Sequence, residues 1–131
     1  MKILKQLLFL LFIALINSCA SNAKFPISNV VPAAVISAKK KIDSQNNFNI
    51  EITAQNLASA DRLDPPGNNY SIWISTKDHG VKNIGQLNVE NAKKTTFKTV
   101  TPFDFNEIFI TVENKGDLEY PEGVEIARTK I

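Results

Sequence analysis

The stretch FNIEITA, residues 48–54, decides the fold class of this chain. Its apolar and polar side chains alternate without a break, so Phe48, Ile50 and Ile52 share one face of an extended strand. A helix would need apolar residues every three or four positions instead. Strict alternation is typical of a strand with one face buried and the other face solvated, as in an antiparallel sheet. The stretch therefore predicts β structure with a single buried face.

The chain after residue 32 repeats this pattern of short strands between turn clusters rich in Asp, Asn, Gly and Pro. Besides residues 48–54, we predict strands over residues 33–42, 70–75, 81–89, 93–101, 108–112 and 124–128. We expect Gly85 to mark a bulge, and Phe97 and Val100 to point inward. About seven short strands at this spacing predict an all-β domain over residues 33–131, an immunoglobulin-like antiparallel sandwich.

The first 18 residues have the features of an export signal. Lys2 and Lys5 give a basic start, and residues 7–16 (LLFLLFIALI) form an unbroken apolar run. A helix of that length rises about 15 Å, half of the ~30 Å hydrocarbon core, and is too short to span a bilayer. It has the length of the apolar region of a signal peptide. We predict a signal peptide over residues 1–18, helical in its apolar part.

The next residues, Ile16-Asn17-Ser18-Cys19, resemble the bacterial lipobox, in which an aliphatic, a variable and a small residue precede a cysteine. The resemblance implies that the Cys19 thiol receives diacylglycerol, that cleavage occurs before it, and that the new amine is acylated, with palmitate a typical chain. Each buried CH₂ contributes about 0.8 kcal/mol, so two or three acyl chains form a lasting membrane anchor. The alternative is a signal peptide cut elsewhere, which leaves Cys19 as a free thiol.

Two features near Cys19 predict where the protein is located. Ala20 resembles the residue after the cysteine in outer-membrane lipoproteins, because Asp there is typical of inner-membrane retention. The first acidic residue after Cys19 is Asp43, too far along to resemble an acidic surface-export signal. We expect a lipid anchor on the periplasmic face of the outer membrane. Residues 19–32 lack clear periodicity and are predicted to be a tether that reaches at most about 45–50 Å.

The formal charge of +2 comes from the signal segment. Lys2 and Lys5 belong to that segment and no acidic residue does, so the chain from residue 19 carries thirteen basic and thirteen acidic side chains. Nucleic-acid binding needs a basic excess to neutralise phosphates. We therefore predict no nucleic-acid partner, and we interpret the basic run 39–41 as a strand end protected from edge pairing.

Two ordered sets of residues resemble the extracytoplasmic domain of RskA-type anti-sigma factors. The first set is Leu57, residues 65–67 (PPG), 70–74 (YSIWI) and 84–87 (IGQL); the second is residues 105–113 (FNEIFITVE), Gly116, Pro121 and Gly123. The resemblance covers residues 33–131 and implies a domain outside the membrane that senses or transmits an envelope signal. The family's cytoplasmic sigma-binding domain and transmembrane helix have no counterpart in this sequence. We therefore expect the chain not to be a membrane-crossing anti-sigma factor itself.

Few side chains in the sequence offer chemistry. Trp73 lies between Ile72 and Ile74, and we predict a core or inter-sheet position, with an exposed sugar-stacking platform as the alternative. His79, the one histidine, is expected in a solvated turn and lacks the partners of a catalytic base or of a zinc or copper site. Five carboxylates are expected in loops or at strand ends, and no calcium-loop spacing relates them: Asp61, Asp64, Asp78, Asp104 and Glu107. We predict no catalytic residue, no metal and no cofactor.

These observations favour a non-enzymatic envelope module, expected to be a monomer, that binds a protein or a cell-wall component. Its expected contact segments are loops 59–69 and 115–123, because loops on a rigid scaffold carry most binding functions. The alternative is a hydrolase acting on an envelope polymer, which would need His79 in a deep pocket with two carboxylates.

Overall fold

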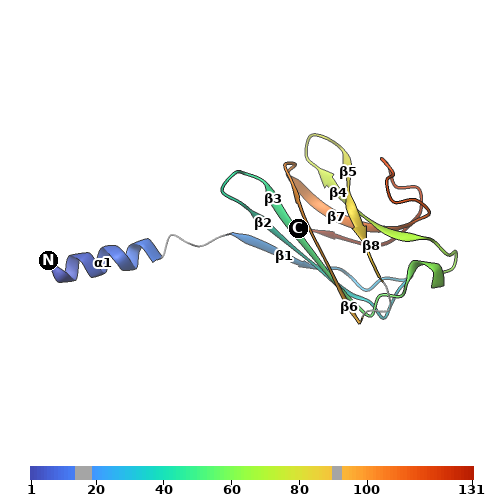
Figure 1. Cartoon of the computed structure of the whole chain (residues 1–131), viewed down its shortest axis with the longest axis horizontal. Coiled ribbons are helices and arrows are strands. Elements are labelled where there is room, and N and C mark those ends of the chain that lie inside the picture. Colours follow the sequence, from blue (N-terminus) through green and yellow to red (C-terminus); the bar gives the residue numbers. More distant parts are fainter. Residues whose placement is uncertain (14–18, 90–92) are drawn as a thin grey trace.

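The computed structural model describes residues 1–13, 19–89 and 93–131, which form an N-terminal helix and a two-layer β-sandwich (Figure 1). The elements of these described residues are α1 (Lys2–Ile13), β1 (Ala20–Lys24), β2 (Val35–Ile42), β3 (Phe48–Gln55), the short 3₁₀ turn η1 (Ala60–Arg62), β4 (Asn69–Thr76), β5 (Val81–Leu87), β6 (Lys94–Thr101), β7 (Phe105–Glu113) and β8 (Val124–Lys130). Figure 1 shows that α1 lies outside the sandwich.

Each layer is an antiparallel sheet of four strands, in the orders β1-β2-β3-β6 and β5-β4-β7-β8. β3 pairs with the edge strand β6, and β4 pairs with β7 at the centre of the other sheet, so each sheet contains one pairing between strands that are distant in sequence. Counted from β2, the second and fifth strands share one sheet, while the third, sixth and seventh share the other. This is the arrangement of immunoglobulin-like sandwiches. The predicted all-β sandwich is confirmed.

β3 builds the centre of one layer, as its alternating residues predict. Ile50, Ile52 and Ala54 point between the sheets and are at most 2% exposed. The opposite wall comes from fully buried side chains of β4 and β7, which are Ile72, Ile74, Ile108 and Ile110. Phe97 of β6 packs against this core, whereas Val100 is 56% exposed on the outer face. The inward prediction for Val100 is wrong, because residues three apart fall on opposite faces of a strand.

β5 carries the predicted bulge at Gly85. The register between β4 and β5 shifts at Ile72 and Trp73, and Gly85 has a φ of +141°. A Cβ atom at this position would lie 2.5 Å from the Phe97 ring. Both the backbone angle and the close approach require glycine.

Residues 20–24 form an edge strand where the sequence predicts a tether. β1 pairs with β2 along its whole length, beginning with Ala20 opposite Lys41. Four of its five side chains are exposed, so β1 is joined to the sheet by backbone hydrogen bonds and shows no apolar alternation. The tether prediction over residues 19–32 is wrong for this reason.

The segment between β1 and β2 also belongs to the domain. Phe25 and Val31 are buried in the core, and the Val31 N–H donates to the Ser28 hydroxyl at 3.1 Å. The Phe25 N–H donates to the Ile36 carbonyl at 2.9 Å. The sandwich therefore begins at residue 20, directly after Cys19, and not at residue 33.

The basic run 39–41 lies inside a sheet and not at its edge. β2 is covered by β1 on one side and β3 on the other, so the interpretation as protection against edge pairing is wrong. Lys39 and Lys41 point out of the sandwich, whereas Lys40 between them is only 14% exposed. Its ammonium contacts the Asp104 carboxylate at 3.0 Å and lies 4.3 Å from the centre of the Phe105 ring. The strand's alternation thus gives adjacent lysines different environments.

Candidate lipidation site and binding loops

Cys19, the predicted lipidation site, is exposed and carries a free thiol. The lipobox residues before it, Ile16, Asn17 and Ser18, lie outside the described residues. α1 has twelve residues and therefore rises about 18 Å. Over the described ranges, no helix combines the length and apolar character that crossing a membrane requires. The exposed thiol lies one residue before the first strand of a sheet.

The strand registers place Cys19 at one end of the sandwich. Ala20 is opposite Lys41, and the β2–β3 turn follows directly after β2. β6 ends beside the start of β3, and β4 ends beside the start of β7, so the turns after these strands lie at the same end. We call this end the anchor end; its turns are residues 43–47, 77–80 and 102–104.

The two predicted contact loops, 59–69 and 115–123, meet at the opposite end, which we call the loop end. β4 begins opposite the last residue of β7, so one loop enters the sheet where the other leaves it. Asn68 joins the two loops. Its N–H donates to the Glu113 carbonyl, and its side-chain amide donates to the Asn114 carbonyl, both at 2.9 Å.

Loop 59–69 is held by buried groups on β4 and within the loop itself. Ala60 is buried, and the Tyr70 hydroxyl donates to the Ala58 carbonyl at 2.6 Å. Burial, together with the negative charge of Asp61, raises the pKa of Tyr70 to about 12. The protonated phenol, which is the form that donates this hydrogen bond, therefore persists to a higher pH than in an exposed tyrosine.

A cavity of about 180 Å³ lies between the two loops. Its apolar lining comes from Val30, Leu63, Pro65, Pro66, Val112 and Val124. Val30 and Val124 remain 36% and 43% exposed, and Tyr120 of the second loop is 70% exposed. Exposed apolar side chains around a hollow are typical of binding surfaces. The sequence does not indicate this site, because Val30 lies in the segment predicted to be a tether.

A larger and more polar hollow, of about 460 Å³, flanks loop 59–69 on its other side. Its lining includes Asp61, Asn68 and Asn69 from the loop and Gln86 from β5. Loop 59–69 thus stands between an apolar cavity and a polar one, and both open at the loop end.

Trp73 is buried, but it does not lie between the two sheets. Its neighbours Ile72 and Ile74 point into the core, so the alternation turns Trp73 to the outer face of its sheet. The indole stacks on Phe109 with ring centres 6.3 Å apart, and its N–H donates to the Thr111 hydroxyl at 2.8 Å. The predicted burial is confirmed, whereas the inter-sheet position is wrong. A fully buried indole offers no face to a sugar.

Loop 114–123 covers this indole. The side-chain amides of Asn83 and Gln86 on β5 donate to the Gly116 carbonyl. At the other end of the loop, Glu113 accepts the Thr111 hydroxyl at 2.6 Å and the Glu122 N–H at 3.2 Å. We call the outer face of this sheet the covered face; its buried side chains are Ser71, Trp73, Phe109, Thr111 and Glu113.

The remaining polar candidates are divided between the two ends. His79 is exposed in the β4–β5 turn at the anchor end, where its N–H donates to the Thr76 hydroxyl at 2.9 Å. Its ring centre lies 4.9 Å from that of Phe103. Asp61 and Asp64 lie at the loop end, and Asp78, Asp104 and Glu107 lie at the anchor end. In the described part of the chain, no three His, Cys, Asp or Glu side chains gather closely enough to hold a metal ion.

Two of these carboxylates bind basic partners. Asp104 lies 2.8 Å from Lys77 and 3.0 Å from Lys40, and hydrogen bonds from these two ammonium groups lower the pKa of Asp104 to about 2. Glu107 lies 2.5 Å from the Arg128 guanidinium, which covers the Phe109 ring of the covered face. These contacts have a structural role at the rim of the sandwich.

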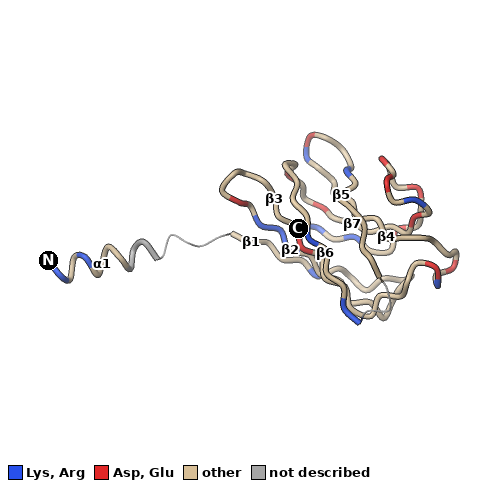
Figure 2. Tube along the Cα trace, in the orientation of Figure 1, with Lys and Arg blue, Asp and Glu red and all other residues tan. Residues whose placement is uncertain are grey.

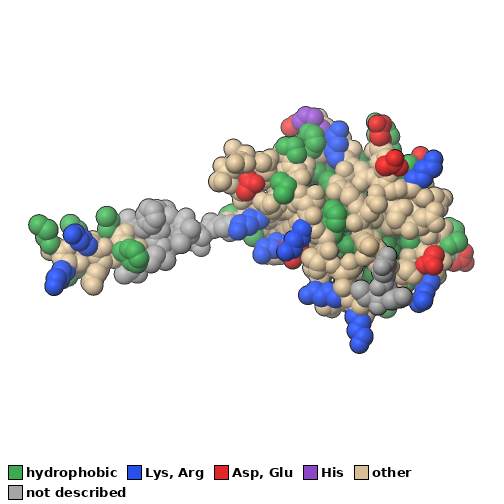
Figure 3. All heavy atoms as spheres, in the orientation of Figure 1, with side chains coloured by type: hydrophobic (Ala, Val, Ile, Leu, Met, Phe, Trp, Pro, Cys, Tyr) green, Lys and Arg blue, Asp and Glu red, His purple; other side chains and the backbone are tan. Residues whose placement is uncertain are grey.

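The outer face of the other sheet, β1-β2-β3-β6, is strongly basic. Among the described residues, its outward positions carry one carboxylate, Glu51, and five lysines, Lys24, Lys39, Lys41, Lys94 and Lys98. We call it the lysine face. Figure 2 shows basic positions on β2 near the start of β1, and Figure 3 shows basic side chains gathered on the side of the domain nearest α1.

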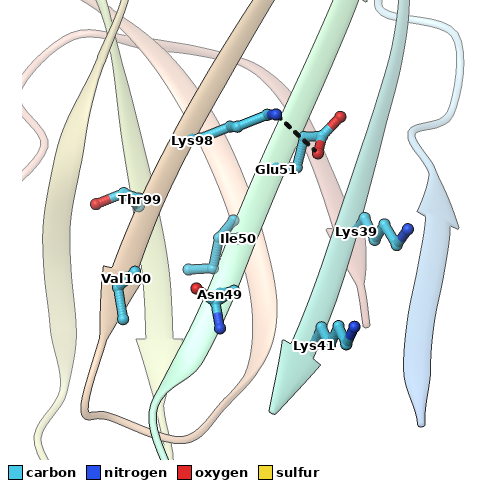
Figure 4. A pocket seen from close by; sticks show the side chains of 8 residues that line it. All are labelled: Lys39, Lys41, Asn49, Ile50, Glu51, Lys98, Thr99 and Val100. Atoms are coloured by element: carbon cyan, nitrogen blue, oxygen red, sulfur yellow. Dashed lines mark ion pairs between the residues drawn. The ribbon is translucent and has the colours of Figure 1, made fainter. Parts of the chain in front are cut away.

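A hollow of about 290 Å³ lies on the lysine face. Figure 4 shows Lys98 directed toward Glu51, at 3.9 Å, while Lys39 and Lys41 extend from β2 away from that carboxylate. The sequence does not indicate this face, because its lysines come from three strands that are brought together by the strand register.

No family model, no curated protein and no solved structure matches this chain. The resemblance to the extracytoplasmic domain of RskA-type anti-sigma factors therefore stays a prediction. The functional assignment depends on the chain's own residues and their geometry.

Proposed function

We propose that this chain is a lipid-anchored envelope protein whose sandwich binds a protein or a cell-wall component through the loop end. One geometric relation carries the proposal: loops 59–69 and 115–123 meet at the end of the sandwich opposite Cys19. Acyl chains on Cys19 would hold the anchor end at the bilayer. The loop end, with its apolar cavity, then stays accessible to a partner.

The proposed location is the periplasmic face of the outer membrane, on account of Ala20 after the cysteine. The activity is binding without catalysis. Its more specific form, suggested by the resemblance to RskA-type domains, is a sensor that works with a separate regulator. The alternative of a hydrolase has less support, because His79 lies at the anchor end, away from both cavities of the loop end.

The anchor is tested by intact-mass spectrometry of the protein extracted from membranes. The expected mass is that of the chain from residue 19 with diacylglycerol and one further acyl group. Cys19→Ala should remain unprocessed and carry no lipid, while Ser21→Ala, two residues later and exposed, should match the wild type. A Cys19→Ala protein that matures and stays membrane-bound like the wild type would overturn the anchor.

The binding role of the loop end is tested with a matched pair of exposed strand valines. Val124 lines the cavity between the loops and is 43% exposed, whereas Val100 is 56% exposed on the lysine face. A photo-crosslinker at Tyr120 should capture one defined partner in the envelope. Val124→Ser should reduce that product severalfold, and Val100→Ser should leave it unchanged. Equal yields from both variants, or no product at Tyr120, would contradict the proposal.

A further inference from the structure

We propose that the lysine face lies on the anionic headgroups of the membrane that holds Cys19. The inference depends on the proposed lipid anchor and adds the orientation of the anchored domain. It predicts that the sheet β1-β2-β3-β6 rests on the bilayer, while the covered face points away from it.

Lys39 and Lys41 of the lysine face lie close to the proposed anchor at Cys19. The sheet begins at Ala20, so no tether separates it from Cys19. Ala20 is paired with Lys41, and Asn22 is paired with Lys39. Neighbouring strands are about 5 Å apart, which places Lys41 within one strand of the residue that follows the anchor. The acyl chains would therefore bring these lysines to the bilayer surface.

The lysine face carries an excess of positive charge. Five lysines share one carboxylate, Glu51, and the pair it forms with Lys98 is long, at 3.9 Å, and exposed. Lys40 provides the contrast, because its ammonium already contacts Asp104 inside the rim. The lysines of the face thus keep charge that phosphate groups of lipids can neutralise. The anchor raises the local concentration of those phosphates far above that of any other anion.

The lysine face also carries exposed apolar side chains. Val35 and Val100 are 44% and 56% exposed at outward positions, between the lysines. Flexible lysine stems and short apolar side chains suit the boundary between headgroups and acyl chains. Loop 114–123 belongs to the other sheet, so this orientation leaves it in the aqueous phase.

The experiment uses the lipid-modified protein, purified from membranes and reconstituted into two kinds of vesicle. One kind contains phosphatidylcholine alone, and the other contains phosphatidylcholine mixed with phosphatidylglycerol. An amine-acylating reagent is added, and the modification rate of each lysine is measured by mass spectrometry. On anionic vesicles, Lys39, Lys41 and Lys94 should react at least about threefold more slowly than on neutral ones, and high salt should remove the difference.

Lys115 serves as the internal control, because it is exposed in the loop over the covered face. Its rate should be the same on both kinds of vesicle. Two charge-swapped proteins then separate local from overall charge. Replacing Lys39, Lys41 and Lys98 by Glu should abolish the protection of Lys94. The same replacement at Lys82, Lys115 and Lys130, which alters net charge equally, should preserve it.

The outcomes distinguish the two proposals. A protein without lipid on Cys19 overturns the anchor, and the orientation with it. A lipid-modified protein whose lysines react equally on both vesicles overturns the orientation alone. Protection that extends to Lys115 would also contradict it, because the whole domain and not one face would then be shielded. Protection confined to the lysine face supports it.

Discussion

The two outer faces of the sandwich differ in how far their outward side chains are shielded from solvent. The covered face buries Trp73 and Glu113 beneath loop 114–123 and Phe109 beneath Arg128, whereas the lysine face leaves its outward side chains in solvent. Both faces belong to four-stranded antiparallel sheets, so the backbone does not impose the difference. Aromatic side chains on an outer face are stabilised by a cover from the same polypeptide. Lysine side chains are well solvated and need no such cover, so their face is free to contact an anionic surface.

The difference predicts that substitutions on the covered face cost much more stability than substitutions on the lysine face. Trp73→Ala removes a fully buried indole and its contacts with Phe109. The free energy of unfolding should fall by about 3–5 kcal/mol. Urea unfolding followed by circular dichroism measures the change. Val100→Ala on the lysine face is the control and should stay within about 0.5 kcal/mol of the wild type. Similar losses in both variants would remove the contrast.

The hydrogen bonds that link Trp73, Thr111 and Glu113 beneath loop 114–123 should have the next largest effect on stability. Thr111→Val leaves the Trp73 N–H without its acceptor and the Glu113 carboxyl without one donor. Buried groups that lose their partners cost about 1–3 kcal/mol. Hydrogen exchange provides a second measurement, because the Glu122 N–H donates to that carboxyl and should exchange faster. An unchanged exchange rate at Glu122 would show that these hydrogen bonds do not hold the loop.

A smaller effect is expected at the rim, where Asp104 neutralises the inward Lys40. The pKa of Asp104 is lowered from 3.8 to about 2 in the folded protein. The carboxylate therefore stabilises the fold above pH 3.8 and loses this contribution as the pH falls through about 2. The carboxylate is 40% exposed, so solvent screening limits its contribution to about 1 kcal/mol or less.

Asp104→Asn should therefore be less stable than the wild type at neutral pH, and the difference should vanish in acid below the folded pKa. Unfolding curves of both proteins across this pH range test the prediction. A difference that persists unchanged in acid would mean that the ionised carboxylate is not its source.

The smallest effect is expected on the lysine face itself. Lys98→Gln removes a long ion pair with Glu51 in which both side chains are exposed. The free energy of unfolding should change by no more than about 0.5 kcal/mol. A loss as large as that of Thr111→Val would mean that the lysines stabilise the sheet, and would weaken the assignment of this face to a partner.

The sequence predicts the strands wherever one face of a strand is buried and the other is wet. Residues 48–54 match β3 almost to its ends, and the strand predicted over 124–128 matches β8. β4 is harder, because Trp73 is buried on the face opposite Ile72 and Ile74. Both faces of that strand are covered, so its sequence has no alternation and cannot tell which face is the core.

The features missed in the sequence depend on pairing between distant segments. β1 has exposed side chains and is held by its neighbour, so its own residues do not mark it as a strand. The cavity at the loop end combines Val30, Pro66 and Val124 from three parts of the chain. Cys19 and loops 59–69 and 115–123 can be proposed from the sequence alone, because a motif and turn-forming residues mark them locally.

Because β1 begins directly after Cys19, a lipid on Cys19 would limit how far the domain can extend from the membrane. A folded domain of about a hundred residues has a radius of gyration of about 13 Å. In the proposed lipid-anchored form no spacer would separate the lipid from the sheet, because β1 begins at Ala20, and the whole domain would stay within a thin layer of water above the bilayer. A partner anchored across a wider gap would then have to extend to this layer itself, and a partner in the same membrane would meet the domain by lateral diffusion alone.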